Sequence, residues 1–364
     1  MQNFPMVLNE DEVRRLLPME DLIPAMADAL RDLSAGAVLQ PLRTVLPVLE
    51  HEGFFGVMPA CGRALGAKLV TFYPENKGVH THHAMILLFR PETGEPLAVM
   101  DGRLITEMRT AAVSAVATKL LARADAKVLT ILGSGVQARS HLEALRLVRE
   151  FTEVRVWSPR NAERFAREFK VRAATSPEKA ARGADVIVVA TAATTPVLRG
   201  KWLAHGAHIN AIGATQPNWR ELDDEVLRRA MIYVESREAA LKESGDVIAA
   251  KKDPIEIGDV IAGKQPARKS IDEITLFKSV GVAAEDLAAA DLVYQKRTER
   301  GSQYSLVGKA TLCEAGVMKE HRLPSLCAQR SFTPLPCSLK NSGENPRWAH
   351  RQQACVPRIR SNRT

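Results

Sequence analysis

Hydrophobic and polar positions change their spacing twice along this 364-residue chain. Residues 13–30 carry apolar side chains at helical spacing, after Asn9 and three acidic residues that are typical of a capped helix start. Between residues 43 and 102, Gly and Pro separate short apolar runs, as the strands of an antiparallel sheet require. These runs are RTVLPVL, GFFGVMPA, GAKLVTFY, AMILLFR and PLAVMDG.

A helix and then a regular alternation follow. Thr106–Leu121 is rich in Ala, Val and Leu and predicts a helix capped by Thr106. From residue 127, strands alternate with helices, which indicates a parallel sheet covered on both faces. The predicted strands are KVLTILG (127–133), EVRVW (153–157), DVIVVAT (185–191), HINAIG (208–213) and MIYVES (231–236), and a last helix covers 281–296.

The composition is that of a folded globular protein, with 46% hydrophobic and 25% charged residues. No apolar run reaches the roughly 18 residues of a membrane helix, and the N-terminus lacks the pattern of a secretory signal. We therefore expect neither a membrane protein nor a secreted disulfide scaffold. Cys61 is the only cysteine in residues 1–295, which fits a reducing, cytoplasmic compartment.

The net charge of +8 belongs to the C-terminal end of the chain. Residues 296–364 contain 13 Lys+Arg and 4 Asp+Glu, whereas residues 1–295 carry a net charge of −1. A basic body that binds nucleic acid is therefore not expected. From about residue 303 the chain is rich in Pro, Ser, Arg and Cys without a sustained period, so we predict a divergent, disordered tail over 303–364. The irregular cysteine spacing in this tail does not predict a metal site.

A dinucleotide fingerprint lies where the first strand of the alternating region ends. Gly133, Ser134, Gly135, Val136 and Gln137 form, with the alanine that follows, the pattern G-x-G-x-x-A. The glycines allow a tight turn and a close backbone approach to a pyrophosphate, whose charge the helix N-terminus stabilises. We therefore predict an α/β fold in which residues 113–279 are a Rossmann NAD(P)-binding domain. The alternative is a glycine turn in an unrelated α/β sheet.

The end of the second strand of this domain indicates which dinucleotide binds. An NAD enzyme usually places Asp or Glu there, to bind the ribose 2′-hydroxyl. Here Trp157 is followed by Ser158, Arg160 and Asn161, which can hold a 2′-phosphate instead. We predict NADPH as the cofactor, with NADH weaker. The alternative is that Arg160 is only a solvated residue at a helix start.

Eight segments make the chain similar to the ornithine cyclodeaminase/mu-crystallin family over about residues 5–300. They are QPLRTVLPV (40–48), GVMPA (56–60), KLVTFY (68–73), AVMDGRLITEMRTAAVSAVATKLL (98–121), ILGSGVQARSH (131–141), HINAIGATQPNWRELDDE (208–225), EAALKESGDVI (238–248) and FKSVGVAAED (277–286). The resemblance implies the Rossmann domain and a second, α+β domain for dimerisation and substrate binding. We assign this domain to residues 1–112 and 280–302, and expect a homodimer.

Within the family, the chain resembles the ketimine-reducing members most. That resemblance implies NADPH-dependent reduction of cyclic ketimine carboxylates: piperideine-2-carboxylate, pyrroline-2-carboxylate and sulfur-containing relatives. It also implies thyroid hormone binding at the substrate site. Cyclodeaminases of the family carry two functional carboxylates where this chain has Gly56 and Thr215, which argues against ammonia loss. The alternatives are an alanine-dehydrogenase-like enzyme and an NADPH- and thyroid-hormone-binding protein with little turnover.

Three cations are candidates for binding the substrate carboxylate. Arg43 and Arg109 offer planar, bidentate donors, and we place Arg109 in the first turn of the Ala-rich helix. Lys68 opens an apolar strand, where partial burial would lower its pKa and suit proton exchange. With the support of the resemblance, we assign Lys68 and Arg109 as catalytic, and Arg43, Lys68, Arg109 and Trp219 as substrate-binding. The alternatives are a solvated Arg109 and a Lys68 that faces solvent.

The resemblance also implies further cofactor contacts. They are Thr81, His82 and His83 of the HTHH motif, Arg109, Thr191, Ile212 and Ser279. For the HTHH motif the alternative is a polar surface strand. Asp246, in ESGD, is interpreted as a helix-terminal cap rather than a catalytic acid.

Overall fold

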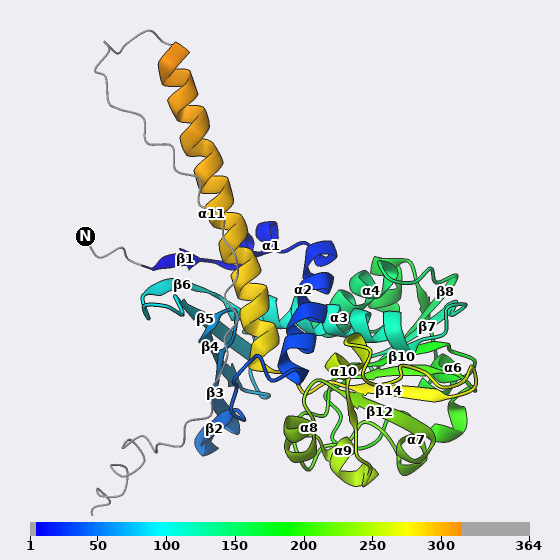
Figure 1. Ribbon diagram of the computed structural model, residues 1–364. Helices are drawn as coiled ribbons and strands as arrows, with labels where there is room; N and C mark the ends of the chain where they lie inside the picture. The colour runs from blue at the N-terminus through cyan, green and yellow to red at the C-terminus, as the bar shows by residue number, and fades with distance from the viewer. Residues whose placement is uncertain (1–4, 315–364) are drawn as a thin grey trace, which may run out of the picture. The chain divides into compact units, whose positions relative to one another are not determined.

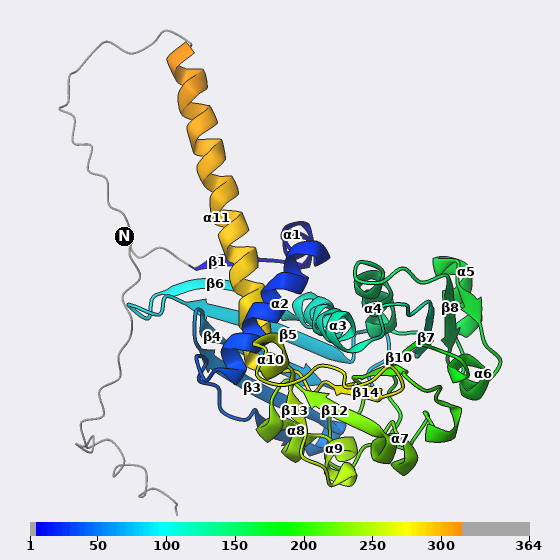
Figure 2. The ribbon, with the colours of Figure 1, turned by 45° about the vertical axis from the view of Figure 1, so that its right-hand side comes forward.

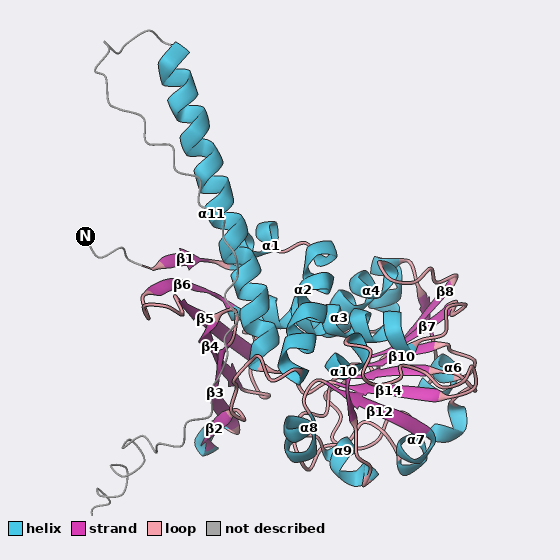
Figure 3. Ribbon diagram, in the orientation of Figure 1, coloured by secondary structure: helices cyan, strands magenta, loops and turns pink. Residues whose placement is uncertain are grey.

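The computed structural model describes residues 5–314 of the chain, and side chains over 5–299. Two β-sheets organise this part, and both belong to one compact unit, Met1–Lys309 (Figure 1). Along the chain, helices alternate regularly with strands only in the part that forms the second of these sheets. Figure 3 distinguishes the helices and strands by colour.

The first sheet has six strands. They are β1 (Met6–Leu8), β2 (Thr44–Val48), β3 (Gly53–Cys61), β4 (Leu65–Phe72), β5 (His82–Phe89) and β6 (Pro96–Asp101). In the order β1-β6-β5-β4-β3-β2, the strands β2 to β6 pair antiparallel, as predicted. β1 adds to β6 in parallel, and the sequence analysis missed it because three residues carry too little pattern.

Three helices pack against one face of this sheet and against one another. They are α1 (Glu10–Leu16), α2 (Met19–Ser34) and the first half of α11 (Ala283–Glu314). Figure 2 shows α2 and α11 side by side, and Leu22, Met26 and Leu287 share their buried core. The predicted cap of α1 is confirmed: Asn9 Oδ1 accepts from the Glu12 N–H, and the Glu12 side chain accepts from the Asn9 N–H, each at 3.0 Å.

The Ala-rich helix α3 (Gly102–Leu121) begins earlier than predicted. Its N-cap is Asp101, whose Oδ1 accepts from the Leu104 N–H at 2.8 Å. The prediction of Thr106 as the cap is wrong, because strand β6 runs directly into Asp101 and the helix starts there; the Thr106 hydroxyl donates to Gly102 O inside the helix. A Cβ on Gly102 would lie 3.0 Å from Ala84, so this junction favours glycine. α3 contacts β4 and β5 of the first sheet and two strands of the second.

The second sheet has eight parallel strands in the order β13-β12-β14-β11-β10-β7-β8-β9. They are β7 (Val128–Leu132), β8 (Glu153–Trp157), β9 (Arg172–Ala173), β10 (Val186–Val189), β11 (His208–Ala211), β12 (Ala230–Val234), β13 (Ile255–Glu256) and β14 (Ile274–Lys278). The predicted parallel sheet is confirmed. β14 lies in its interior, between β11 and β12, and the sequence analysis missed this strand.

Helices cover both faces of the second sheet, as predicted. One buried cluster joins α3 to α4 (Val136–Arg146) and α5 (Ala162–Phe169); another joins α6 (Pro177–Ala181) to α7 (Asp224–Arg229). Three short helices, α8 (Arg237–Glu243), α9 (Gly245–Ala250) and α10 (Ile257–Ile261), precede β14. The architecture is therefore the predicted α/β Rossmann fold together with an antiparallel α+β region.

The last helix extends beyond the predicted residues 281–296, from Ala283 to Glu314. Residues 303–314 are therefore helical rather than disordered, which is possible because no proline occurs between 283 and 314. The remainder of the predicted tail, 315–364, lies outside the described residues. None of the helices in the described part of the chain has the length and apolarity that a membrane crossing needs.

Candidate active site

The turn after β7 has the geometry of a dinucleotide-binding loop. Gly133 has a φ of 127°, and a Cβ at this position would lie 2.2 Å from the Ala190 carbonyl oxygen. Gly135 is the N-cap of α4 and has open space around its Cβ position. No side chain caps α4, so the N–H groups of its first turn are available to a phosphate. The turn therefore fits a pyrophosphate.

This turn lies at the point where the strand order reverses. β7 has β8 on one side and β10 on the other, and parallel α/β sheets bind ligands at the carboxyl ends of such a pair. Ser134, Val136 and Gln137 lie in this turn and at the start of α4. The Gln137 Oε1 atom is buried without a hydrogen-bond partner in the described part of the chain.

The residues that we predict to bind the 2′-phosphate follow β8, the neighbour of β7. The Ser158 Oγ accepts from the Asn161 N–H at 3.1 Å, so the loop is held in a tight turn. Arg160 and Asn161 are exposed, and no ion pair is found for Arg160 among residues 5–299. The loop thus presents a solvent-exposed guanidinium at the carboxyl edge of the sheet.

A buried ion network brings Lys68 and Arg109 together. Both are held by Asp286, in the first turn of α11: its Oδ2 lies 2.6 Å from Lys68 Nζ, and its Oδ1 accepts from Arg109 Nε at 3.0 Å. Glu285 Oε2 accepts from Arg109 Nη1 at 2.8 Å. All four side chains are buried. Lys68 lies in the middle of β4, not at its start, and it is more deeply buried than predicted.

Arg109 lies about two turns into α3, because the helix begins at Gly102. Its predicted place in the first turn is wrong, and the alternative of a solvated arginine is wrong too, since only 4% of its surface is exposed. A Cβ on Gly281, in the FKSVG motif, would lie 2.5 Å from Arg109 Nη2. Glycine there lets the link between β14 and α11 pass close to the guanidinium.

Burial sets the charge state of the groups around this network. Burial lowers the pKa of Lys68 to about 8, against the opposing effect of the Asp286 carboxylate. Burial also lowers the pKa of His82 to about 4, helped by the positive charges of Lys68 and Arg109. Burial raises the pKa of Glu285 to about 8, although Arg109 opposes this. The predicted depression of the Lys68 pKa is confirmed.

Arg43 lies just before β2 and approaches the same network from another side. Its Nη2 donates to the carbonyl oxygens of Val280 and Gly281, each at 2.7 Å, and forms an ion pair of 2.7 Å with Glu243. Arg43 is near enough to Lys68 to lower its pKa. It also borders a cavity of about 200 Å³, lined in part by Met58, Glu243 and Gly281.

The other predicted contacts are spread around the carboxyl edge of the second sheet and the start of β5. Thr81 and His83 are exposed, and His82 is partly buried. Ile212 and Ser279 are buried, directly after β11 and β14. The Thr191 hydroxyl is already used, since it donates to Glu221 Oε1 at 2.6 Å. Trp219 is partly buried in the segment that follows β11.

Sequence reasoning missed three acidic residues of the network. Asp286 and Glu285 hold the two cations, and Glu235 accepts from the N–H groups of Val280 and Gly281 at 3.0 and 3.3 Å. The acidic pair in FKSVGVAAED was the available signal. It resembles the ordinary acidic first turn of a helix, so its contacts could not be inferred.

Comparisons with known proteins find relatives over most of the chain. Residues 3–301 match the ornithine cyclodeaminase/mu-crystallin family. Ketimine reductase mu-crystallin of Mus musculus is 51% identical over 308 residues, covering 81% of this chain and 98% of that protein. The solved structure of Delta(1)-pyrroline-2-carboxylate reductase from Thermococcus litoralis, in complex with NADH and L-proline, is 39% identical with a TM-score of 0.78, and covers 81% of this chain and 98% of its own. An archaeal alanine dehydrogenase dimer with bound NAD is 36% identical with a TM-score of 0.77, at 82% and 97% coverage.

Proposed function

This chain belongs to the ornithine cyclodeaminase/mu-crystallin family, and we propose that it is an NADPH-dependent reductase of cyclic ketimine carboxylates. It is an NAD(P)H-dependent oxidoreductase that acts on C=N bonds. The proposed substrates are piperideine-2-carboxylate, pyrroline-2-carboxylate and their sulfur-containing relatives. The observation that carries the proposal is the buried Lys68–Asp286–Arg109 network in the same compact unit as the dinucleotide turn.

The network suits a substrate that carries a carboxylate beside an imine carbon. Arg109 and Lys68 supply two positive charges that neutralise and orient the carboxylate. Below a pH of about 8, Lys68 holds a proton at Nζ and adds to the positive field. NADPH held by the turn at Gly133–Gln137 would supply the hydride that the imine carbon needs; with one proton taken up at the imine nitrogen, the products would be a cyclic amino acid and NADP⁺.

Gly56 occupies a crowded position where the cyclodeaminases carry one of their two carboxylates. A Cβ on Gly56 would lie 2.9 Å from Val70 Cγ1, so a glutamate there would require the Val70 side chain to move. Thr215 takes the place of the other carboxylate and supplies no general base of comparable strength. Both positions support reduction without loss of ammonia.

We propose NADPH over NADH because Arg160 is exposed directly after β8, where no acidic residue is available to a ribose 2′-hydroxyl. NADH is the weaker cofactor. We also propose that thyroid hormone competes for this site, because its α-amino carboxylate offers the same anion to Lys68 and Arg109. The single free Cys61 of residues 1–295 supports a cytoplasmic compartment.

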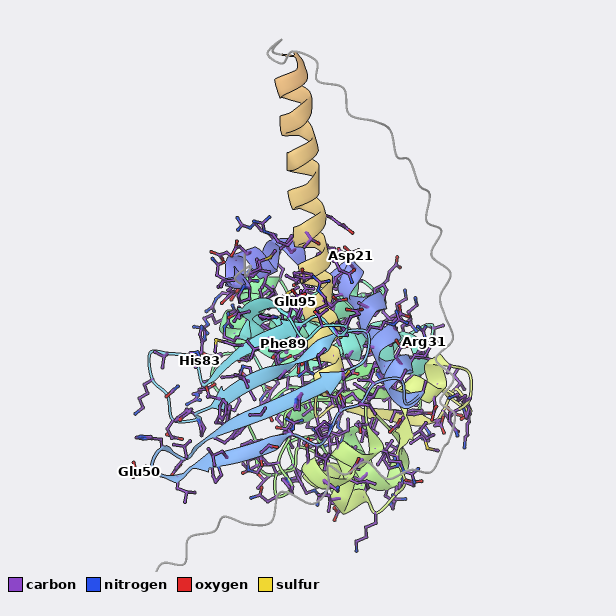
Figure 4. All side chains as sticks on the ribbon, turned by 60° about the vertical axis from the view of Figure 1, so that its left-hand side comes forward. Asp21, Arg31, Glu50, His83, Phe89 and Glu95 are labelled. Carbon is purple, nitrogen blue, oxygen red and sulfur yellow. The ribbon has the colours of Figure 1, made fainter. Side chains whose placement is uncertain are left out.

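A homodimer is proposed on the open face of the first sheet. Residues 1–112 and 280–302 stay our assignment for the dimerisation and substrate domain, and 113–279 for the cofactor domain. One face of this sheet packs on α2, α3 and α11, and the opposite face carries Leu46, Phe55, Leu69 and Met85. Figure 4 looks onto that face, with His83 and Phe89 at opposite ends of β5. Leu46 and Met85 are 62% and 52% exposed, and a contiguous apolar face favours a second copy of the chain.

The test is to mix the purified protein with piperideine-2-carboxylate and to follow the loss of reduced cofactor absorbance with NADPH and, separately, with NADH. Rapid oxidation of NADPH is the expected result. The same assay is run in parallel with pyruvate and ammonia, because an alanine dehydrogenase would convert these two substrates to alanine by reductive amination. Binding of NADPH without turnover of either substrate would contradict the reductase and favour a binding protein.

A further inference from the structure

A second buried cluster of charges lies beneath the carboxyl edge of the Rossmann sheet. It consists of Glu221, Asp246 and Lys278, which expose no surface. Glu221 lies between β11 and α7, Asp246 in the first turn of α9, and Lys278 at the end of β14. Neither Glu221 nor Lys278 has a role in the function proposed above.

The Glu221 carboxylate binds two loops at once. Its Oε1 accepts from the Thr191 N–H at 2.9 Å and from the Thr191 hydroxyl at 2.6 Å. Its Oε2 accepts from the N–H groups of Gly213 and Ala214, at 2.7 and 3.1 Å. Thr191 follows β10, and Gly213 and Ala214 follow β11. One carboxylate therefore fixes the backbone of both loops at the edge where the dinucleotide is proposed to bind.

The main chain of Glu221 is itself held in place. Asp246 Oδ1 accepts from the N–H groups of Glu221 and Leu222, each at 3.2 Å. The Glu221 carbonyl accepts from the N–H groups of Val197 and Leu198 at 2.9 and 3.0 Å. Asp246 is thus not the cap of α9, whose N-cap is Ser244, but a support for the segment that carries Glu221.

The charges of the cluster explain how the carboxylate can be buried. Burial raises the pKa of Glu221 and of Asp246, and Lys278 opposes this for both. Lys278 Nζ lies 4.0 Å from Asp246 Oδ2. A buried carboxylate is costly unless its oxygens are satisfied, and here each oxygen of Glu221 accepts two hydrogen bonds. A Cβ on Gly213 would lie 2.3 Å from Glu221 Oε1, so this close approach requires glycine.

We infer that Glu221 is a positioning residue for the nicotinamide half of the cofactor: it holds the loops after β10 and β11 in their binding conformation. The inference rests on the proposed dinucleotide site, but not on the identity of the substrate. The adenosine half belongs to the other side of the reversal point, at the turn after β7 and the Ser158–Asn161 loop. Glu221 contacts neither of these segments, so its effect is confined to one half of the ligand.

The test compares two ligands in the full-length protein. NADPH carries both halves, whereas 2′-phospho-ADP-ribose lacks the nicotinamide. Glu221→Gln keeps the shape but turns an NH₂ group toward one pair of donors, so at least one backbone N–H loses its acceptor. We expect the Kd for NADPH to rise about tenfold or more, while the Kd for 2′-phospho-ADP-ribose stays within about twofold. The matched control is Asp185→Asn, which loosens the opposite, amino edge of the same sheet through Lys127 and Val128.

Each outcome decides a different claim. Equal weakening of both ligands, or unchanged NADPH binding, in Glu221→Gln would overturn the positioning role. Failure of the wild type to bind NADPH would overturn the proposed cofactor site, and the inference with it. If Glu221→Gln does not fold, Thr191→Val removes one of the four hydrogen bonds, and the same selective loss is expected at smaller size.

Discussion

The Nζ atom of Lys68 lies 2.6 Å from Oδ2 of Asp286, and both side chains are buried. The other carboxylate oxygen binds Arg109, so Asp286 sets the spacing of the two cations from a different element of the fold. The contact joins β4 to the first turn of α11. It also makes the charge of Lys68 dependent on Asp286.

The pH dependence of kcat/KM is expected to reflect this dependence. The pKa of Lys68 is lowered to about 8, so kcat/KM declines as the pH rises through that value and Lys68 loses its proton. Asp286 opposes the lowering; Asp286→Asn therefore lowers the Lys68 pKa further, and the decline moves to lower pH by about one unit. Asp291→Asn, a half-buried carboxylate of α11 bonded to Gln295, is the control and leaves the profile in place. An unshifted profile in Asp286→Asn would contradict the assignment of the pKa to Lys68.

Replacement of Arg109 is expected to affect both folding and catalysis. Arg109→Met leaves Glu285 without its cation and Asp286 with Lys68 alone, which lowers the free energy of unfolding by about 3–5 kcal/mol. Arg109→Lys keeps the positive charge near both carboxylates, so it costs less stability, but it lacks the planar fork of the guanidinium. Both variants are expected to lose about 100-fold in kcat/KM. Denaturant unfolding measures the effect on stability, and initial rates measure the effect on catalysis. The control is Lys119→Met, at an exposed position of the same helix. Wild-type rates in Arg109→Lys would argue against a bidentate role of Arg109.

The two glycines of the dinucleotide turn are expected to respond differently to alanine. Gly133→Ala places a Cβ against the Ala190 carbonyl in a backbone conformation with positive φ, so it lowers the melting temperature. Gly135→Ala meets no atom within 4 Å and leaves the melting temperature of the free protein unchanged. The added methyl group occupies the space of the pyrophosphate, so NADPH binding weakens about tenfold or more. Unchanged NADPH affinity in Gly135→Ala would place the pyrophosphate elsewhere.

Cofactor preference is expected to depend on Arg160. Arg160→Glu replaces a cation by an anion at the proposed 2′-phosphate, so the KM for NADPH rises about tenfold or more while that for NADH changes little. Arg164→Glu makes the same change of charge on the exposed side of α5 and serves as the control. Equal effects of the two substitutions would indicate that Arg160 acts only through its positive charge and does not bind the 2′-phosphate directly.

Dimerisation is expected to depend on the open face of the first sheet. Met85→Asp introduces a charge at its centre, and Leu46→Asp does so on the edge strand β2. Sedimentation equilibrium should show dimers of the wild type and monomers of either variant. The control is Ile271→Asp. Ile271 is 65% exposed and lies just before β14 of the second sheet, so this substitution should leave the dimer intact. Dimers in both Met85→Asp and Leu46→Asp would exclude this face.

The local pattern of the sequence was sufficient for most elements and for the dinucleotide turn. Strand and helix periods depend on neighbouring residues, and the G-x-G-x-x-A turn is formed by contiguous residues, so both can be predicted without the fold. The start of α3 was wrong because the choice between Asp101 and Thr106 as the cap depends on where β6 ends. The interior strand β14 was missed because a run of five residues is too short to be recognised by its pattern. It becomes a strand by pairing with β11 and β12.

The sequence by itself therefore determined the order of most elements and the Rossmann turn, and with the family resemblance it indicated Lys68 and Arg109 as the cations of the site. Only the tertiary structure decided which carboxylates hold them, because Asp286 reaches Lys68 and Arg109 from the far end of the described chain. The same holds for Glu221, whose donors lie on two loops that meet only when β10 and β11 pair. A charged side chain has no periodicity, and its partner depends on the through-space packing of elements that are distant in sequence.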